Sequence, residues 1–490
     1  MEAILFGTGK AGREALPYLE KQYHILFWAD NDEKKQGTIL KNYPVKSPEE
    51  IKKHDCIILI TSTKYGIEIA EQLRQMKIVE ERIYLCRRFQ TDDVYEYEAY
   101  PTEVEKLSCM EMPLVQYDLY HKEEQETGCK KVLIFCLLFS VYVKQLIENM
   151  ACRYEDIDFS LITNAKESAE KIVSERLKHI YYFRRMADLK SILEQLPMYD
   201  AMQLLWMERE WAYFYKLIRK KSRRLNLHMG GSDFYRSTDK EKNLKKGLID
   251  CADCVVVQTE ETGERFSAYY GKAAADKTIV LPYGIEVLEL IRDSRNSSEN
   301  RIKIKYNIPL DRVVVTCGHN ANEAHQHMKM IEALKQLPEY IKKQIVCIFP
   351  MTYPKGYDDY IQCISKSLKD SGLPHVILKE FMDFQEMAEY ALISDIMIHV
   401  QTTDQLSSAM LEEMYAGTIV IAGKWLPYRS LHEIGIFFRD VEEICNITEV
   451  LEDVVTNIEK YKGKCTGNTE IVWRHSSWDE LAVRWRSLWN

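Results

Sequence analysis

The stretch AILFGTGKAGREALPYLEKQYHILFWAD, residues 3–30, decides the fold class of the chain. An apolar run ends in a glycine-rich turn, a segment with helical periodicity follows, and a second apolar run ends at Asp30. A strand, a turn, a helix and a second strand form the first unit of a parallel sheet that is covered by helices. The sequence therefore predicts an α/β protein.

The glycines of this stretch indicate a nucleotide-binding turn. Gly7, Gly9 and Gly12 match GxGxxG, in which the glycines allow a tight turn, close approach of a diphosphate, and packing of helix on strand. The helix N-terminus presents N–H groups to an anion, and Asp30 is placed to bind a ribose. We expect these four residues to bind NAD or a nucleotide-sugar. The alternative is a nucleotide-binding shape that holds nothing.

The same alternation continues through the 490 residues and predicts three Rossmann-like units in series. A fresh apolar run, KVLIFCLLF, starts at Lys131, and the polar stretch RDSRNSSENR precedes the third unit. Residues 91–130 are acidic and rich in tyrosine, so we expect a linker or an irregular excursion there. The predicted domains are 1–125, 126–300 and 301–474, followed by an amphipathic helix at 475–490.

Composition excludes several classes of protein. The net charge of −9 argues against a nucleic-acid-binding protein, and no apolar run reaches the roughly 18 residues that span a membrane. The N-terminus lacks the pattern of a signal peptide. The 13 cysteines are scattered, as in a reducing cytoplasm, and we expect the close pair Cys251 and Cys254 to pack in the core. These features predict a cytoplasmic protein.

The N-terminal unit resembles a known family over residues 1–90. FWADNDEKKQG, YPVKSPEEI and DCIILITS are similar to segments of bacterial sugar O- and N-acyltransferases of the sialic-acid-acetyltransferase type. In that family a small Rossmann-like domain binds a nucleotide-sugar, so the resemblance implies that Gly7, Gly9, Gly12 and Asp30 line the ligand. The repeat domain of those acyltransferases has no counterpart here.

The second and third units resemble glycosyltransferases of the two-Rossmann-domain (GT-B) architecture. The motifs are HMGGSDFYR (228–236), LPYGI (281–285) and DQLSSAMLEEMYAGTIVIAG (404–423), the last similar to glycosyltransferase family 4. The resemblance implies that the second unit binds the acceptor, the third binds a nucleotide-sugar, and the C-terminal helix packs back on the acceptor domain. Glu412 would accept hydrogen bonds from the ribose. Asp404 stands in place of the first acid of the family motif and would contact the donor sugar.

A further resemblance is to the bacterial 4-acetamido-4,6-dideoxygalactose transferase family. The matching segments are Gly318-His319-Asn320 with His327 at a helix start, FPMTYPKG (349–356), and Gly231–Tyr235. The resemblance implies a UDP- or dTDP-linked sugar donor and no metal ion. The donor-binding residues would be Gly318, His319, Asn320, His327, Thr352, Tyr353, Asp404 and Glu412.

Asp233 and His228 are the candidate catalytic residues. An inverting transfer needs a general base for the acceptor hydroxyl, and Asp233 follows a glycine turn with His228 behind it. In a retaining transfer the donor phosphate can act as base, and Asp233 becomes an acceptor contact. Both mechanisms stay open, as does a turn-forming role for Asp233.

Three histidines, His319, His325 and His327, lie within nine residues and suggest a metal site at first sight. On one helix, however, residues two apart point to different sides, so His325 and His327 would not share an ion. We expect instead a phosphate-binding turn made by Gly318–Asn320 and His327, with His325 at the surface.

The segment WAYFYKLIRKKSRRLN, residues 211–226, combines aromatic and basic side chains. Such a helix can lie on an anionic membrane surface, which would suit a polyprenyl-linked acceptor and peripheral contact with the inner face of the membrane. The alternative is an ordinary helix with its aromatic side chains in the core and its charges in solvent.

These patterns together favour a metal-independent, hexosyltransferase-type glycosyltransferase. It would move a sugar from a nucleotide-diphosphate sugar to a saccharide or polyprenyl-linked acceptor in the synthesis of a bacterial surface polysaccharide or glycan. The first alternative is an NAD-dependent oxidoreductase or sugar-modifying enzyme that uses the N-terminal glycine turn. The second is a non-catalytic sensor or assembly protein.

Overall fold

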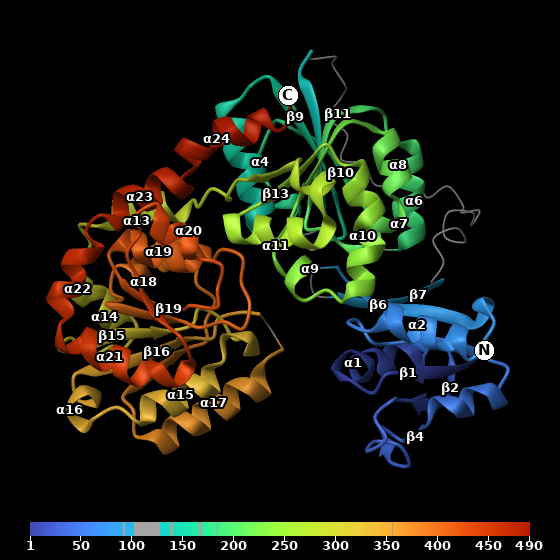
Figure 1. Cartoon of the computed structure of the whole chain (residues 1–490), viewed down its shortest axis with the longest axis horizontal. Coiled ribbons are helices and arrows are strands. Elements are labelled where there is room, and N and C mark those ends of the chain that lie inside the picture. The colour runs from blue at the N-terminus through green and yellow to red at the C-terminus, as the bar shows by residue number, and fades with distance from the viewer. Residues whose placement is uncertain (92–93, 102–127, 138–140, 166–168, 184, 355) are drawn as a thin grey trace. The chain divides into compact units, whose positions relative to one another are not determined.

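The computed structural model describes residues 1–91, 94–101, 128–137, 141–165, 169–183, 185–354 and 356–490. Contacts divide the chain into two compact units, Met1–Val255 with Leu488–Asn490, and Val256–Ser487. Three sheets rich in parallel strands follow one another along the chain, with helices between the strands (Figure 1). The predicted α/β fold with three Rossmann-like units is confirmed.

The first sheet has the strand order β3-β4-β2-β1-β5-β6-β7. The central strands pair in parallel, and the outer pairs β3–β4 and β6–β7 are antiparallel. The chain therefore builds outward from β1 to one side and then, starting with β5, to the other. The elements are β1 (Glu2–Phe6), α1 (Lys10–Leu19), β2 (His24–Ala29), β3 (Ile39–Leu40), β4 (Tyr43–Lys46), β5 (Ile57–Ile60), α2 (Gly66–Gln75), β6 (Ile83–Thr91) and β7 (Val94–Pro101).

The prediction of a linker or irregular excursion at 91–130 is wrong for part of this range. Val94–Pro101 form β7, which pairs with β6 in an antiparallel hairpin. Glutamates alternate with tyrosines along the sequence of β7, and this period of two is typical of a strand in an antiparallel pair. Residues 102–127 lie outside the described part of the chain.

The second sheet has the order β10-β9-β8-β11-β12-β13-β14, and its first five strands pair in parallel. It again grows from its first strand, β8, to both sides. The strands are β8 (Lys130–Cys136), β9 (Ile157–Thr163), β10 (Leu177–Tyr182), β11 (Tyr199–Leu205), β12 (Ser222–His228), β13 (Cys254–Val257) and β14 (Thr278–Val280). The helices between β8 and β13 are α4 (Val141–Arg153), α6 (Met186–Gln195), α7 (Arg209–Tyr213), α8 (Tyr215–Lys220), α9 (Ser232–Tyr235) and α10 (Asp239–Cys251).

The basic and aromatic segment 211–226 does not form one helix. It consists of the end of α7, the whole of α8 and the start of β12. Trp211, Tyr213 and Phe214 are buried, and the ring of Trp211 packs edge-on against Phe135 of β8. The aromatic side chains thus belong to the core, as the alternative interpretation of this segment expects.

The third sheet has the order β17-β16-β15-β18-β19-β20, and every pair in it is parallel. This is the order 3-2-1-4-5-6 of a doubly wound Rossmann sheet. One apolar cluster contains Met330 and Ile331 of α15, and another contains Met410 and Leu411 of α19. The strands are β15 (Val313–Cys317), β16 (Ile345–Pro350), β17 (His375–Leu378), β18 (Ile396–His399), β19 (Ile419–Gly423) and β20 (Arg439–Val441).

Within the second compact unit, α11 and α12 connect β13 to β14 of the second sheet, and the helices from α15 to α20 connect the strands of the third sheet (Figure 1). The two acids Asp358 and Asp359 lie in the first turn of α17, where the helix dipole stabilises carboxylates. The helices are α11 (Glu260–Tyr270), α12 (Lys272–Ala275), α13 (Val287–Ser294), α14 (Glu299–Lys305), α15 (His327–Lys335), α16 (Glu339–Lys342), α17 (Asp358–Ser371), α18 (Phe384–Ala391), α19 (Ser408–Ala416), α20 (Arg429–Glu433), α21 (Ile447–Thr456), α22 (Ile458–Cys465), α23 (Asn468–Ser476) and α24 (Trp478–Ser487).

The C-terminal segment forms α24 and a short tail. In α24, Trp478 and Trp485 are buried, and the Trp485 indole N–H donates to the carbonyl oxygen of Pro282 at 3.0 Å. Gly284 is needed beneath this helix, because a Cβ there would lie only 2.6 Å from Cγ of Trp478. The tail Leu488–Asn490 belongs to the first compact unit, where Trp489 packs edge-on against Phe159.

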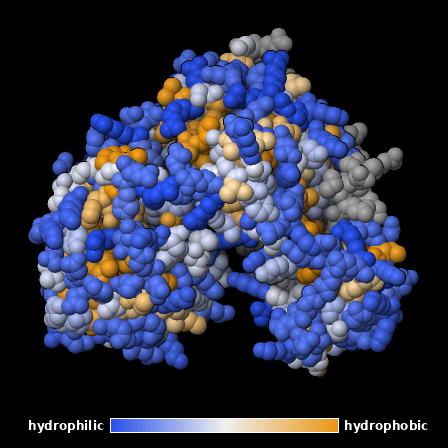
Figure 2. All heavy atoms as spheres, in the orientation of Figure 1, coloured by the Kyte–Doolittle hydropathy of each residue, from blue (hydrophilic) through white to orange (hydrophobic). Residues whose placement is uncertain are grey.

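None of the described helices is both long enough and apolar enough to cross a membrane. On the face drawn in Figure 2, hydrophilic side chains predominate and apolar ones are scattered in small areas.

We expect Gly12→Ala to destabilise the first compact unit. A Cβ at Gly12 would overlap the carbonyl oxygen of Gly7 and lie 2.9 Å from the ring of Trp28. Overpacking of this kind costs about 1–3 kcal/mol. Thermal unfolding of the two variants Gly12→Ala and Gly9→Ala checks this, because no described atom lies within 4 Å of a Cβ at Gly9. Equal melting temperatures for the two variants would contradict the packing role of Gly12.

Candidate functional site

The strongest candidate site lies where the order of the third sheet reverses. β15 and β18 are neighbours, and the chain continues from them toward opposite edges of the sheet. Ligands of doubly wound proteins bind in the crevice outside the carboxyl ends of the strands at such a point. The turn after β15 holds His319 and Asn320, and the loop after β18 holds Asp404. The topology thus selects the residues that the sequence predicts to bind the donor.

Four histidine rings gather at this point. The His319 ring meets His325 edge-on with centroids 4.3 Å apart and stacks on His399 at 5.9 Å, and His327 lies 5.5 Å from His325. Gly318 has φ +69°, and a Cβ there would lie 2.8 Å from Nε2 of His327. A glycine is therefore required for the turn to pack against the rings.

The expectation that His325 lies at the surface is wrong, because the residue is 1% exposed. The turn Glu323–His325 is a 3-10 helix, Gln326 takes the left-handed conformation, and α15 begins only at His327. The two histidines therefore do not lie on one helix, and the spacing argument does not apply to them. Among the described residues, no three His, Cys, Asp or Glu side chains are placed to hold a metal ion.

Burial keeps the predicted donor-site histidines neutral. It lowers the pKa of His319 to about 3, with a contribution from His399, and the pKa of His327 to about 4. Nδ1 of His327 lies 3.2 Å from the Tyr360 hydroxyl, and its Nε2 is buried without a hydrogen-bond partner among the described residues. A buried ring nitrogen of this kind requires a partner, which a ligand or a water molecule can supply.

Asp404 is the centre of a hydrogen-bond network. Its carboxylate accepts from the side chain of Gln401 at 3.2 Å, from the hydroxyl of Tyr428 and from the backbone N–H of Gln405 at 2.8 Å, and lies 3.3 Å from Nε2 of His399. Burial alone would raise the pKa of Asp404, but the hydrogen bonds and the charge of His399 outweigh it and lower the pKa. The group stays ionised and fixed in place.

Glu412 differs from Asp404 because its carboxyl group has no hydrogen bond to the described residues. It lies on α19, is 6% exposed, and burial raises its pKa to about 7. The side chain of Tyr353 is 41% exposed, its hydroxyl takes a hydrogen bond from Asn320, and the charge of Glu412 reaches it. A ligand hydroxyl could satisfy the carboxyl group of Glu412.

The turn after β16 is tied to the turn after β15. The backbone N–H of Ala321 donates to the carbonyl oxygen of Tyr353 at 2.7 Å. Thr352 is half-buried in the same turn. The side chain of Asn320 also accepts from the backbone N–H of Asn322 at 2.8 Å, so this residue helps to shape the turn. The structure thus brings the predicted donor-binding residues to one edge of the sheet, while their contacts with a donor remain a prediction.

Several residues at this edge of the sheet are not among those that the sequence predicts for the site. His399 and Tyr428 contact Asp404, and the Trp425 indole N–H donates to the carbonyl oxygen of Gln401 at 2.6 Å. The sequence does carry one signal, because His399 follows the apolar residues of DIMIHV and a polar residue at the end of a central strand points to the crevice. Tyr428 and Trp425 carried no comparable signal.

Glu413, the neighbour of Glu412, has a structural partner. It is buried, and burial raises its pKa to about 8. The Thr418 hydroxyl lies 2.8 Å from its Oε2 and 2.9 Å from the carbonyl oxygen of Ser394. One hydroxyl proton cannot serve both oxygens. A protonated Glu413 that donates to Thr418, which then donates to Ser394, satisfies every group.

The carboxylate of Asp30 forms hydrogen bonds with the N-terminal glycine turn. The Asp30 carboxylate accepts from the backbone N–H of Thr8 at 2.9 Å, from the Thr8 hydroxyl and from the backbone N–H of Asp32 at 2.9 Å. Burial alone would raise the pKa of Asp30, but these hydrogen bonds outweigh burial and lower the pKa. Gly7 has φ +111°. A role for Gly7, Gly9, Gly12 and Asp30 in binding a ligand stays a prediction.

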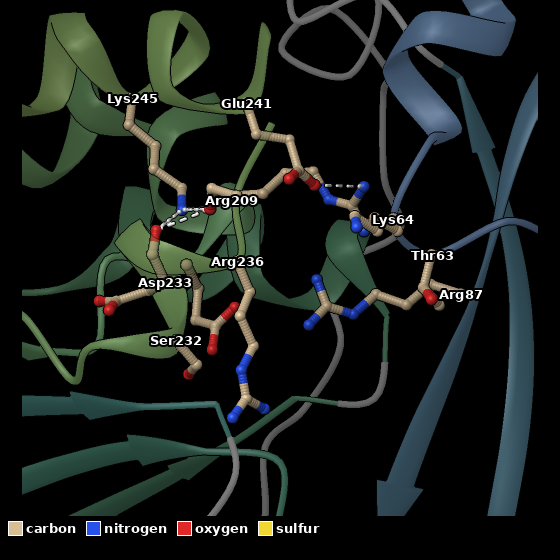
Figure 3. Close-up of a pocket in the computed structure, with 11 residues that line it drawn as sticks. Thr63, Lys64, Arg87, Arg209, Ser232, Asp233, Arg236, Glu241 and Lys245 are labelled. Atoms are coloured by element: carbon tan, nitrogen blue, oxygen red, sulfur yellow. Dashed lines mark hydrogen bonds and ion pairs between the residues drawn. The ribbon is translucent and has the colours of Figure 1, made fainter. Parts of the chain in front are cut away.

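Asp233 lies on α9, after the turn at Gly231. Its Oδ2 accepts from the backbone N–H groups of Met207 at 2.7 Å and Gly230 at 3.2 Å, and its Oδ1 is buried without a hydrogen-bond partner among the described residues. Asp233 lines a cavity of about 310 Å³ (Figure 3). His228 ends β12 and is wholly buried, which lowers its pKa to about 3. His228 is therefore neutral, and the catalytic roles of both residues remain predictions.

Comparisons with known proteins agree with this architecture. A family model described as C2185-like, N-terminal, matches residues 1–84. No curated protein matches the chain. A sucrose-phosphate synthase from Thermosynechococcus elongatus is 13% identical, with a TM-score of 0.60, over 74% of this chain and 98% of its own.

Two further solved structures show the same likeness. HepE from Anabaena, in complex with UDP and glucose, is 14% identical with a TM-score of 0.60 over 73% of this chain and 98% of its own. A trehalose-phosphate synthase from Burkholderia xenovorans, in complex with glucose-6-phosphate, is 8% identical with a TM-score of 0.56 over 74% of this chain and 100% of its own. About three quarters of the chain therefore has the two-domain GT-B fold.

We expect Glu413→Gln to flatten the dependence of stability on pH. The raised pKa means that folded Glu413 keeps a proton which the unfolded chain releases above its ordinary pKa of 4.5. Its contribution to stability is thus complete below that pH and is lost as the pH rises toward about 8. The amide of glutamine donates to Thr418 at every pH.

The melting temperature of the second compact unit, measured from about pH 5 to pH 8, checks this. The variant should lose less stability than the wild type over that range. Glu442→Gln, at an exposed position, is the control and should follow the wild type. Parallel curves for Glu413→Gln and wild type would show that Glu413 is ionised in the folded protein.

Proposed function

We propose that the chain is a glycosyltransferase that takes a sugar from a nucleotide-diphosphate sugar. The observation that carries this proposal is the carboxyl group of Glu412, which is buried, has no hydrogen bond to the described residues, and lies at the switch point of a GT-B fold. HepE, whose fold is similar, is described in complex with UDP and glucose, which supports a UDP-linked donor.

The third sheet offers suitable groups for such a donor. Glu412 would accept hydrogen bonds from the ribose hydroxyls. The diphosphate would lie near the turn at Gly318–Asn320 and His327, where backbone N–H groups and the imidazole can donate to the oxygens of the leaving group. The neutral state of His327 leaves one ring N–H available, and Tyr360 decides through Nδ1 which nitrogen carries it.

Asp404 would contact the hydroxyl groups of the donor sugar. The bonds from Gln401, Tyr428 and the backbone of Gln405 hold its carboxylate in one orientation, so binding would not have to order it. Under this proposal the protein itself stabilises the leaving diphosphate, and the enzyme is a metal-independent transferase of the hexosyl type.

The acceptor is a saccharide or a polyprenyl-linked saccharide of a bacterial surface glycan. Asp233 would meet its hydroxyl, either as general base or as a hydrogen-bonding contact. Such a chain would work in the cytoplasm, with a polyprenyl-linked acceptor drawing it to the inner face of the membrane. An oxidoreductase that binds NAD is not proposed, because Asp30 already bonds to Thr8 and no comparison points to a nicotinamide cofactor.

We expect UDP to raise the melting temperature of the wild type by binding the second compact unit. A ligand at 100 times its Kd stabilises the native state by about 2.7 kcal/mol. Glu412→Ala should abolish the shift, because it removes the acceptor for the ribose. Glu442→Ala, which removes an exposed carboxylate of the same unit, should keep it. An unchanged shift in Glu412→Ala would refute the assignment of the donor site.

Asp233→Asn separates the two roles of Asp233. The asparagine oxygen can still accept from Met207 and Gly230, so the loop should fold. If Asp233 is the general base, kcat for sugar transfer should fall by roughly 10²–10⁴ with little change in KM. If Asp233 only contacts the acceptor, KM should rise and kcat should change little. Full activity with an unchanged KM would exclude Asp233 from both roles.

A further inference from the structure

The cavity beside Asp233 is built entirely from charged and hydroxyl side chains. It has a volume of about 310 Å³, at the lower end of the range for small-molecule sites. Such sites are usually lined by apolar and aromatic groups with a few polar ones. This cavity has none of the former, which favours a highly polar ligand. Its lining consists of Thr63, Lys64, Arg87, Glu208, Arg209, Ser232, Asp233, Arg236, Ser237, Glu241 and Lys245.

Both sheets of the first compact unit contribute to the cavity. Figure 3 shows Thr63, Lys64 and Arg87 on elements of the first sheet, and Arg209, Arg236 and Lys245 on elements around the second. Thr63 and Lys64 follow β5, the strand at which the order of the first sheet reverses. The cavity therefore includes the loop where a ligand of that sheet would be expected.

Ion pairs and a hydrogen bond join the elements around the first sheet to the helices around the second sheet beside this cavity. Arg87 of β6 forms an ion pair with Glu210 of α7, and Lys240 of α10 pairs with Glu71 of α2. Glu98 of β7 accepts from the backbone N–H of Met186 at 3.1 Å. Because β6, β7 and α2 contact the helices α6, α7 and α10, the groups on both sides of the cavity keep fixed positions.

A buried carboxylate holds two guanidinium groups side by side at the cavity. Glu210 is completely buried and contacts both Arg87 and Arg209, the latter at 3.5 Å. Arg209 also lies 3.7 Å from Glu241. Guanidinium groups that are fixed in this way are preorganised for an anion, because little side-chain entropy remains to be lost on binding.

Positive charge exceeds negative charge in the cavity. Five cationic and three acidic side chains line it, so two positive charges are in excess, or one when the buried Glu210 is included. Burial, and more weakly the charge of Arg209, lower the pKa of both Arg87 and Lys245. The cations are thus close enough to disfavour one another, and an anion would relieve their repulsion.

The donors suit a phosphoryl group better than a carboxylate. Guanidinium groups bind phosphate through two parallel hydrogen bonds, and the hydroxyl groups of Thr63 and Ser232 supply further donors. A phosphate ester offers three oxygens to this set, whereas a carboxylate offers two. The remaining volume leaves room for the group that carries the phosphate.

We propose that this cavity binds the phosphoryl group of a small phosphorylated ligand, and that the first and second sheets hold it jointly. The N-terminal domain would thereby complete a site on its neighbour. The further step, that the ligand is the acceptor, rests on the proposed function and on Asp233, which lines the cavity. The phosphoryl group could then belong to a sugar phosphate in solution or to the diphosphate of a prenyl-linked acceptor.

Isothermal titration of the full chain with glucose 6-phosphate and with farnesyl diphosphate tests the proposal. Lys64→Gln changes the first-sheet side of the cavity, and Arg236→Gln changes the other side. Both side chains are exposed at the cavity, so both variants should fold. Each should weaken binding about tenfold or more, the usual loss when a charge-assisted hydrogen bond is removed. Lys131→Gln, which removes an exposed cation of β8, should bind like the wild type.

The outcomes are distinct. Binding of glucose 6-phosphate alone supports a sugar phosphate, and binding of farnesyl diphosphate alone supports a prenyl-linked ligand. Binding of neither probe, or equal binding by the wild type and both cavity variants, would overturn the site. If only Arg236→Gln weakens binding, the joint role of the two sheets is wrong. The shift produced by UDP tests the second compact unit separately, so failure here does not depend on the proposed function.

Discussion

The structure depends on one topological constraint, which is that each sheet grows outward in both directions from its first strand. Parallel strands need long crossovers, and a reversal of direction leaves a gap between crossovers at the carboxyl ends of two neighbouring strands. β1 with β5, β8 with β11, and β15 with β18 are these neighbours. The gap beside β15 and β18 contains the histidine rings and Asp404, and the gap beside β1 and β5 contains the glycine turn.

The candidate site of the third sheet contains several ionisable groups that are buried in surroundings of low dielectric constant. His319 and His327 are held neutral by burial, Glu412 has a pKa near neutrality, and Asp404 keeps its charge only because several donors surround it. A carboxylate that is already satisfied offers a fixed acceptor, while one that is not gains most from a new hydrogen bond. The two acids of the predicted motif therefore differ in what they would gain from a ligand.

The sequence is sufficient to predict the strands at the centres of the sheets, because runs such as AILF (3–6) and VLIF (132–135) are continuously apolar. It was insufficient for β7 and β20, whose residues alternate or are few, and for β11, whose run YDAMQLL resembles a helical segment as much as a strand. Within the site, glycine turns and acids at strand ends were visible. The burial of His325 depended on a left-handed residue at Gln326, and the contacts of Tyr428 with Asp404 depended on tertiary packing, so neither was readable from spacing.

The tail Leu488–Asn490 has a consequence for the order of folding. Trp489 packs against Phe159 in the first compact unit, and the side chain of Lys130 donates to Asn490 at 2.7 Å. Asn226 of β12 also donates to the carbonyl oxygen of Leu488. A ribosome synthesises these three residues only after the whole of Val256–Ser487. The first unit to leave the ribosome is thus the last whose core is completed, and its folding cannot finish until synthesis has passed the second unit.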